Sequence, residues 1–497
     1  MQAVPDLVSM FPCVDPGLRC RVRRKISWLI LLMIIAMSMT TKHYFLVDNA
    51  FGQVKKTDPG LSQQNSGKNQ STTLSPMERL GKNIFFDKNL SNPSGMSCAS
   101  CHNPEAGYAG SLDSKINEKY GVGIGVLPTR CESRNPPTIA YLKFCPSGPP
   151  VFHRDLQSYV GGFFRDGRKP DLKSQVLLPL VHPNEMNNVV DNAPAPHLVV
   201  EKIRKAEYAP LFRSVFGPTM FDQPTDKVLD CLAEAVMAFE NSKEVSPFSS
   251  KYDAYLASKA ELTPSEKNGL ELVTGFETSG SDIRMHKSAQ CVVCHAIQIE
   301  HDKGPDLWTQ YCYTNIGVPR NLNNPYYYET NKQANPLGYN PFGWDYVDFG
   351  LGNFLYPEKG LPPGNIGPGS NGQGDFLAVN GAFKVPTLRN VDKRPYPGFV
   401  KAYMHNGYFK SLKDVVHFYN TRNLTSLRGE IIDFTKDDPY QSLKGKPLWP
   451  APEYSAAATL LNPSGQPGQI GNLGLTEAEE GDIVAFLKTL SDGYSQP

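Results

Sequence analysis

The sequence predicts a mainly α-helical fold that is built from two similar units and contains long irregular loops. Two five-residue stretches, "CASCH" at 98–102 and "CVVCH" at 291–295, share the same spacing of cysteine and histidine. Each is preceded by a stretch that carries the start signal of a helix, and strand signals are few. The repeated order of helix, cysteine–histidine motif, loops and helix indicates an internal duplication.

Three helices are predicted from their N-terminal capping signals. In "SPMERLGKNIFFD", Ser75 is the expected N-cap, Pro76 the first helical residue and Glu78 the partner that completes a capping box. The same device recurs in "TPSEKNGLEL" (263–272) and in "TEAEEGDIVAFLKTL" (476–490). The apolar residues of the last helix follow a helical period and predict one buried face: Ile483, Phe486, Leu487 and Leu490.

A polar stretch separates the two units. "FENSKEVSPFSSKYD" (239–253) contains a proline, so we place an N-terminal domain over 74–245 and a C-terminal domain over 246–497. Residues 303–380 are rich in Gly, Pro, Asn and Tyr and show little helical period. They predict a long loop region that lies over the second unit rather than a separate domain.

The N-terminus carries the pattern of an export signal. The basic "RCRVRRK" (19–25) is followed by the apolar "WLILLMIIAM" (28–37), and small residues further on allow cleavage before Gln53. We interpret 1–52 as a signal peptide, with an uncleaved membrane anchor as the alternative, because the apolar stretch is short for a full span. The polar residues 53–73 predict a flexible leader.

Charge and cysteine usage narrow the choice of partner and compartment. The net charge is +1, and no basic run lies beyond the N-terminus, which argues against a nucleic-acid partner. Four of the ten cysteines lie in the two repeated motifs. Cys131 and Cys145 flank a proline-rich loop and are either a disulfide, which an oxidising compartment permits, or two unrelated thiols.

Each cysteine–histidine motif has the chemistry of covalent haem c attachment. Two thiols three residues apart can bond the two vinyl groups, and the histidine that follows can bind the iron. A zinc site or a redox-active pair of thiols is the alternative for a single motif, but two copies in an exported chain favour haem. The predicted attachment residues are Cys98, Cys101 and His102 for the first haem and Cys291, Cys294 and His295 for the second.

From about residue 75 to its end the chain resembles the bacterial dihaem cytochrome c peroxidase and MauG superfamily. The motifs that carry the resemblance are "LGKNIFFDKNLSNPSGMSCASCHNPEAGYAG" (80–110), "RNPPT" (134–138), "FFRDGRKPDLKSQVLLPLVHPNEM" (163–186), "KVPTLRNV" (384–391) and "YMHNGYFKSLKDVVHFYN" (403–420). The resemblance implies two cytochrome c-like haem domains with long irregular loops. The N-terminal domain would be peroxidatic, and the C-terminal domain would transfer electrons.

The resemblance assigns the peroxide pocket of the first haem to Glu185, to Gln175 ten residues earlier and to Phe164 before "RDGR". A carboxylate in this position can take the proton from one peroxide oxygen and return it to the leaving oxygen. The amide can hydrogen-bond the bound peroxide. Pro179 matches a proline that shapes the same pocket.

The peroxidases of this family hold a histidine soon after the first motif, and it caps the iron until the other haem is reduced. Here no histidine lies between His102 and Arg134. We therefore predict a first haem without an exchangeable cap, ready without reductive activation. His153 and His182 are spare candidates, and each is expected to be structural or exposed.

The resemblance places the distal ligand of the second haem in "MHNGYFKSLKDVVHFY". That ligand is Met in the peroxidases and Tyr in MauG, and the count along the motif gives Tyr419, with Met404 as the rival. An anionic Tyr should lower the reduction potential relative to Met. Arg165 stands where the family usually has a Trp that relays electrons between the haems. Arg cannot be oxidised, so Arg165 either pairs with a haem propionate or points to solvent.

The resemblance also implies a calcium ion between the haems. Asn135 in "RNPPT" matches the side-chain ligand, and the carbonyl donors are expected near Val400 to Ala402. Oxygen ligands of this kind suit calcium. The implied partners are hydrogen peroxide and a small periplasmic electron-donor protein, and members of the family are often homodimers.

Three functions follow from these observations. The first is a periplasmic peroxidase that reduces hydrogen peroxide to water with electrons from a small cytochrome c or copper protein, delivered through the second haem. The second is a MauG-like oxidase that uses peroxide to oxidise a protein or small molecule, which Tyr419 favours and Arg165 disfavours. The third is a non-enzymatic electron carrier. Glu185 counts against a carrier, because a carrier needs no acid–base group over the iron.

Overall fold

The structure is a computed structural model that describes residues 73–495 except 154–155, 157, 280–281, 286, 298–304, 356–378, 425–429, 433–439, 443–447 and 455–469. The predicted signal (1–52) and nearly all of the leader (53–73) lie outside the described residues. Within the described part, no helix is both long enough and apolar enough to cross a membrane.

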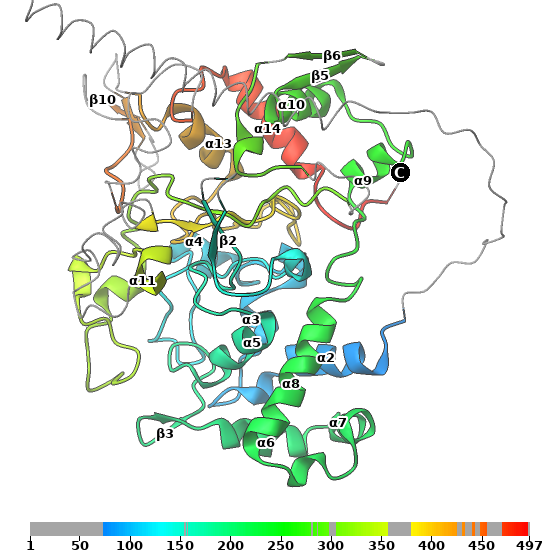
Figure 1. Cartoon of the computed structure of the whole chain (residues 1–497). Helices are drawn as coiled ribbons and strands as arrows, with labels where there is room; N and C mark the ends of the chain where they lie inside the picture. Colours follow the sequence, from blue (N-terminus) through cyan, green and yellow to red (C-terminus); the bar gives the residue numbers. More distant parts are fainter. Residues whose placement is uncertain are drawn as a thin grey trace, which may run out of the picture. The chain divides into compact units, whose positions relative to one another are not determined.

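Helices are the main regular elements of the described part, which confirms the mainly α class (Figure 1). The helices that precede residue 246 are α2 (Pro76–Phe86), α3 (Cys98–Cys101), α4 (Ser114–Lys119), α5 (Leu172–Val181), α6 (Pro196–Lys205), α7 (Ala209–Phe216) and α8 (Thr225–Glu240). The later ones are α9 (Lys251–Leu256), α10 (Pro264–Thr274), α11 (Leu351–Leu355), α13 (Leu412–Thr421) and α14 (Glu477–Lys488).

The strands of the described part are short and pair only as two-stranded antiparallel sheets. These are β1 (Val151–His153) with β2 (Ser158–Val160), β3 (Val189–Val190) with β4 (Ala193–Pro194), β5 (Phe276–Ser279) with β6 (Asp282–Met285), β7 (Tyr313–Thr314) with β8 (Phe383–Lys384), and β9 (Glu430–Ile432) with β10 (Tyr440–Ser442). No larger sheet exists in this part, so helices and loops position the functional residues.

The three predicted capping boxes are present. In each, the cap side chain accepts a hydrogen bond from the backbone N–H three residues later, and the glutamate there accepts one from the N–H of the cap. The pairs are Ser75 with Glu78, Thr263 with Glu266, and Thr476 with Glu479. The predicted face is buried at Ile483, Phe486 and Leu487 of α14 and at Leu490, which follows the end of the helix at Lys488.

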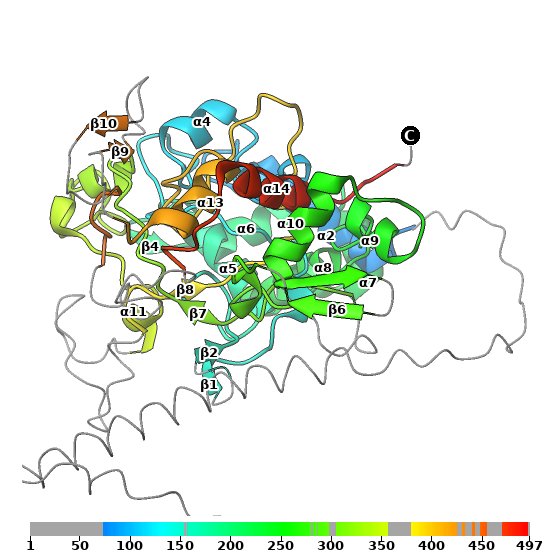
Figure 2. The ribbon, with the colours of Figure 1, turned by 90° about the horizontal axis from the view of Figure 1, so that it is seen from above.

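One helix pair organises each half of the chain. α2 packs against α8, and α10 packs against α14 (Figures 1 and 2). A Cβ atom on Gly81 of α2 would lie 1.8 Å from the carbonyl oxygen of Ala235, and one on Gly269 of α10 would lie 2.0 Å from that of Asp482. Only glycine allows such a close approach. Both glycines sit five residues after the proline that starts their helix, which supports the predicted duplication.

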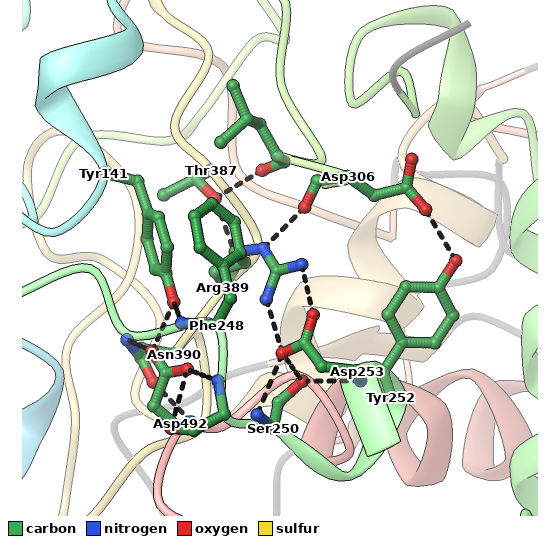
Figure 3. Close-up of polar contacts among 12 residues, drawn as sticks. Tyr141, Phe248, Ser250, Tyr252, Asp253, Asp306, Thr387, Arg389, Asn390 and Asp492 are labelled. Carbon is green, nitrogen blue, oxygen red and sulfur yellow. Dashed lines mark hydrogen bonds and ion pairs between the residues drawn. The ribbon is translucent and has the colours of Figure 1, made fainter. Parts of the chain in front are cut away.

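A buried polar network joins the two halves (Figure 3). The Arg389 guanidinium donates two hydrogen bonds to the Asp253 carboxylate, at 2.8 and 2.9 Å, and packs 4.5 Å from the centre of the Phe248 ring. The Tyr141 hydroxyl donates to Asp492 at 2.6 Å. The Arg389–Asp253 pair lies within 246–497, whereas the hydrogen bond from Tyr141 to Asp492 joins residues on either side of the predicted boundary.

The loop region 303–380 contains only short elements in its described part, as predicted, and it contacts both halves of the chain. The Asn406 side chain donates to the Pro319 carbonyl at 2.8 Å, as expected for a region that lies over the second unit. Arg134 pairs with Asp348 at 2.7 Å, and the Asn184 side chain donates to the Gly338 carbonyl at 2.9 Å, so the region packs on the first half as well. Buried asparagine side chains supply the hydrogen bonds that irregular backbone needs in such a position.

Candidate functional site

The first cysteine–histidine motif forms one wall of a cavity in the N-terminal half. α3 is a single turn that holds Cys98 and Cys101, and both thiols line the cavity together with His102. Nδ1 of His102 lies 3.3 Å from the Tyr108 carbonyl oxygen, and burial lowers the pKa of the ring. A neutral imidazole held at Nδ1 leaves Nε2 available as an iron ligand.

The residues that the resemblance assigns to the peroxide pocket line the same cavity. They are Phe164, Gln175, Pro179 and Glu185. α5 carries the amide and the proline and ends at Val181. The chain then turns, and the Glu185 N–H donates to the His182 carbonyl at 3.1 Å. The structure thus brings the predicted acid–base carboxyl and the predicted amide into the cavity of His102.

The electrostatics of this wall suit an acid–base group. Burial, and then the negative charge of Glu132, raise the pKa of Glu185 to about 7, against the opposing charges of His182 and Arg168. A carboxyl with a pKa near neutrality can both accept and return a proton. The raised value agrees with the role that the resemblance gives Glu185.

Two residues, Glu132 and His182, lie beside Glu185, and the sequence did not predict this position for either of them. Oε1 of Glu132 pairs with Nδ1 of His182 at 2.9 Å, and the ligating atoms of Glu132, His182 and Glu185 all lie within 4.8 Å of one another. Glu132 belongs to no motif, and His182 was expected to be structural or exposed. His153 lies on β1 and is exposed.

Among the described residues, no histidine besides His102 lines the first cavity. The stretch after the motif instead contributes Gly123 and Ile124, neither of which can bind iron through its side chain. This stretch is fixed by a backbone hydrogen bond from Glu132 to Gly123 at 2.8 Å. The uncapped first haem stays a prediction.

A second cavity surrounds the other motif and is lined by Cys291, Cys294 and His295. Nδ1 of His295 lies 3.1 Å from the Pro386 carbonyl oxygen and 3.3 Å from that of Trp308. Burial lowers the pKa of this imidazole to about 4, so it too is a neutral ligand.

Both candidate distal ligands, Tyr419 and Met404, line the second cavity. Tyr419 lies near the end of α13, and burial, followed by the Cys294 and Cys291 thiols, raises the pKa of its phenol. Arg422, one turn later, opposes that shift, and its Nη2 has no hydrogen-bond partner among the described residues. Burial therefore keeps this phenol protonated, and ionisation would need a metal that displaces the proton, with Arg422 stabilising the phenolate.

Arg165 lines both cavities. Its Nε donates to the Asn135 carbonyl at 2.7 Å, and no carboxylate in the described part pairs with it. Burial, and then the charge of Arg134, lower the pKa of Arg165 to about 9. A buried cation needs a compensating anion. Of the two alternatives, the position of Arg165 on both walls favours a haem carboxylate over bulk solvent.

The residues expected to bind calcium lie beside the cavities. The Asn135 side chain donates to the carbonyl oxygens of Ala402 at 2.9 Å and Met404 at 3.2 Å. The Val400 carbonyl accepts a hydrogen bond from the Asn117 side chain at 3.1 Å, and the calcium donors expected near Val400 to Ala402 stay a prediction. If the amide of Asn135 were turned over, its oxygen would join these two carbonyls, which is a donor set that suits calcium.

Cys131 and Cys145 are both buried free thiols, so the disulfide alternative was wrong. Sγ of Cys145 lies 3.6 Å from Nζ of Lys384 instead. Burial raises the pKa of Cys145, and the lysine opposes that shift.

Both cavities fit a covalently attached haem. Each supplies two thiols and an imidazole whose Nδ1 lies within reach of a backbone carbonyl, which is the environment that a proximal haem ligand requires. The first cavity adds an acid–base carboxyl, whereas the second adds two candidate iron ligands. The two sites are therefore chemically unequal.

Known proteins resemble this chain over part or most of its length. A family model described as di-haem cytochrome c peroxidase matches residues 75–261. The methylamine utilization protein MauG of Paracoccus denitrificans is 32% identical over 84% of this chain and 89% of its own length. The cytochrome c551 peroxidase of Nitrosomonas europaea is 30% identical over 44% of this chain and 51% of its own.

A solved structure resembles the fold as well. The diheme peroxidase BthA from Burkholderia thailandensis superimposes with a TM-score of 0.57 at 28% identity, over 85% of this chain and 87% of that one. The chain therefore belongs to the di-haem cytochrome c peroxidase and MauG family. It is an oxidoreductase of a family that acts on peroxide, and membership implies two haems.

Proposed function

We propose that the protein is an exported di-haem peroxidase that reduces hydrogen peroxide to water at the first cavity. Electrons come from a small cytochrome c or copper protein and pass through the second haem. The observation that carries this proposal is the presence of Glu185 and Gln175 in the cavity of His102. N-terminal sequencing of the haem-loaded protein from the periplasm tests the export and the cleavage before Gln53.

In this proposal the first haem supplies the iron that binds peroxide and passes electrons to it. Glu185 accepts the proton of one peroxide oxygen and returns it to the leaving oxygen, which its pKa of about 7 allows. Gln175 hydrogen-bonds the substrate. The Phe164 ring is covered by the Arg168 guanidinium at 3.7 Å and excludes water from that side.

The test of the proposed function uses the oxidised di-haem protein. We expect peroxide consumption with reduced cytochrome c, without prior half-reduction, because no histidine of the first cavity's described wall can cap the iron. Electron paramagnetic resonance of the resting protein should show one ferric centre that peroxide perturbs. Two low-spin signals that peroxide does not perturb, together with no turnover, would contradict both enzymatic functions and support the electron carrier.

A MauG-like oxidase is the second candidate. The 32% identity to MauG and the position of Tyr419 in the second cavity favour it. In the same assay an oxidase would consume peroxide without reduced cytochrome c when its own substrate is present. Fast turnover with reduced cytochrome c supports the peroxidase instead.

We also propose that Asn135 and the carbonyls of Ala402 and Met404 bind one calcium ion. Chelation of the holoprotein is expected to change the spectra of both haems, because Asn135 lines both cavities. Calcium, but not magnesium, should restore them. Unchanged spectra, together with no calcium by elemental measurement before chelation, would contradict the site.

A further inference from the structure

His182 and Glu132 form a charged pair directly behind the proposed acid–base residue. His182 and Glu185 occupy the first and last positions of the turn that follows α5, joined by the 3.1 Å hydrogen bond from the Glu185 N–H. Glu132 comes from a separate stretch of chain and pairs with His182 at 2.9 Å. Within the described part, no other group of three such residues lies close enough to share one metal-sized site.

The three side chains lead from the cavity to the surface. Glu132 and Glu185 line the first cavity, whereas His182 is not part of its lining. The His182 side chain is 31% exposed, so its ring reaches solvent. A proton taken up by the imidazole from water is therefore one ion-pair contact from Glu132, and Glu132 is within 4.8 Å of Glu185.

The proposed reaction needs such a route. One hydrogen peroxide, two protons and two electrons give two water molecules. Glu185 only moves the substrate's own proton from one oxygen to the other. The first water leaves with both original hydrogens, so the oxygen that remains must receive two protons from outside. The electrons come from the donor protein of the proposed function.

We propose that His182 and Glu132 are the proton entry of the first haem site, and that they deliver these two protons from solvent to Glu185. This inference rests on the proposed function and deepens it. His182 and Glu132 act through Glu185 and are positioning and relay residues, not groups that touch the substrate.

The surrounding charges favour a protonated His182 and an ionised Glu132. Burial is the largest single effect and opposes both charges, but His182 together with Arg168 and Arg134 lowers the pKa of Glu132, and Glu132 together with Glu185 raises that of His182. Arg168 and Arg134 also face this group, and both are paired with Asp166. Arg134 is held by Asp348 as well, so neither guanidinium is available to replace His182.

The experiment is a single turnover of the pre-reduced di-haem protein with peroxide, so that delivery of electrons from the donor cannot limit the rate. Proton delivery follows the internal transfer by Glu185. The charge of His182 lowers the pKa of Glu185, so the variants are compared at a pH well above 7, where Glu185 is ionised in each protein. There His182→Ala should leave the second-order rate constant at low peroxide unchanged and lower the limiting rate at saturating peroxide about tenfold. The solvent isotope effect on the limiting rate should rise, and added imidazole should restore that rate.

Glu132→Gln should also lower the limiting rate but not the second-order rate constant, and imidazole should not restore the limiting rate. This variant tests the relay if His182→Ala does not bind haem. His197→Gln on α6, an exposed histidine outside both cavities, is the matched control and should behave as wild type. The relay is wrong if His182→Ala and Glu132→Gln leave the limiting rate unchanged. It is also wrong if both variants lower the rates at low and at high peroxide equally and imidazole does not restore the rate of His182→Ala. If the wild type itself does not react with peroxide, the proposed function fails instead.

Discussion

Replacing Glu185 by Gln is expected to lower the second-order rate constant for peroxide by about 100- to 10,000-fold, the contribution that a positioned general acid–base group makes. The amide keeps the size and polarity of the side chain but cannot accept the substrate's proton. The measurement is stopped-flow reaction of the haem-loaded protein with peroxide. Both haem spectra should remain unchanged, since Glu185 is not a predicted ligand of either iron.

The rate with peroxide should also depend on pH in a defined direction. The carboxylate form must accept the proton, and the pKa of Glu185 is raised to about 7 by burial and by Glu132. The wild-type rate should therefore fall as pH drops below about 7 and level off above it, and Glu185→Gln should lose this dependence. Glu201→Gln, an exposed residue of α6, is the matched control. If Glu185→Gln keeps the wild-type rate and its fall below pH 7, Glu185 is not the group that accepts the proton of peroxide.

Local signals predicted much of this structure because the interactions that they describe are local. The capping boxes at Ser75, Thr263 and Thr476 involve residues three positions apart, so the sequence contains both partners. The attachment motifs are equally compact. The positions of Gln175 and Glu185 came from the resemblance, and both lie in the cavity of the first motif.

Contacts between distant segments could not be predicted in this way. Glu132 meets His182 only because the stretch after the first motif folds back along the cavity, and neither residue belongs to a periodic pattern. The loop region 303–380 has no period that indicates which surface it covers, and its Asp348 reaches Arg134 of the first half. Tertiary packing decides such pairings, and a single sequence does not display it.

Arg165 shows how one substitution changes the meaning of a site. The resemblance places Arg165 where the family usually has a Trp that relays electrons. The Arg165 guanidinium lines both cavities and has no carboxylate partner in the described part. A cation between two sites stabilises added negative charge on either side. Arg165 offers no oxidisable step between the two cavities, and a haem carboxylate paired with it would offset much of its charge. The missing step supports the proposed peroxidase over an oxidase that shares oxidising equivalents between its haems.

Replacing Tyr419 by Met is expected to raise the reduction potential of the second haem on the order of 100 mV or more, within the roughly 0.8 V that axial ligands span. An anionic phenolate stabilises ferric iron, whereas a thioether favours the ferrous state. Potentiometric titration gives the potential, and electron paramagnetic resonance should show an altered ferric signal for the second haem only.

Met404→Leu is the matched control, because Met404 lines the same cavity and Leu keeps its bulk. If Tyr419 is the ligand, Met404→Leu leaves the potential and the spectrum of the second haem unchanged. If Tyr419→Met leaves the potential and the spectrum of the second haem unchanged and Met404→Leu changes them, the thioether of Met404 is the ligand. A high-potential second haem would then accept electrons readily, and its distal ligand would be the Met of the peroxidases rather than the Tyr of MauG.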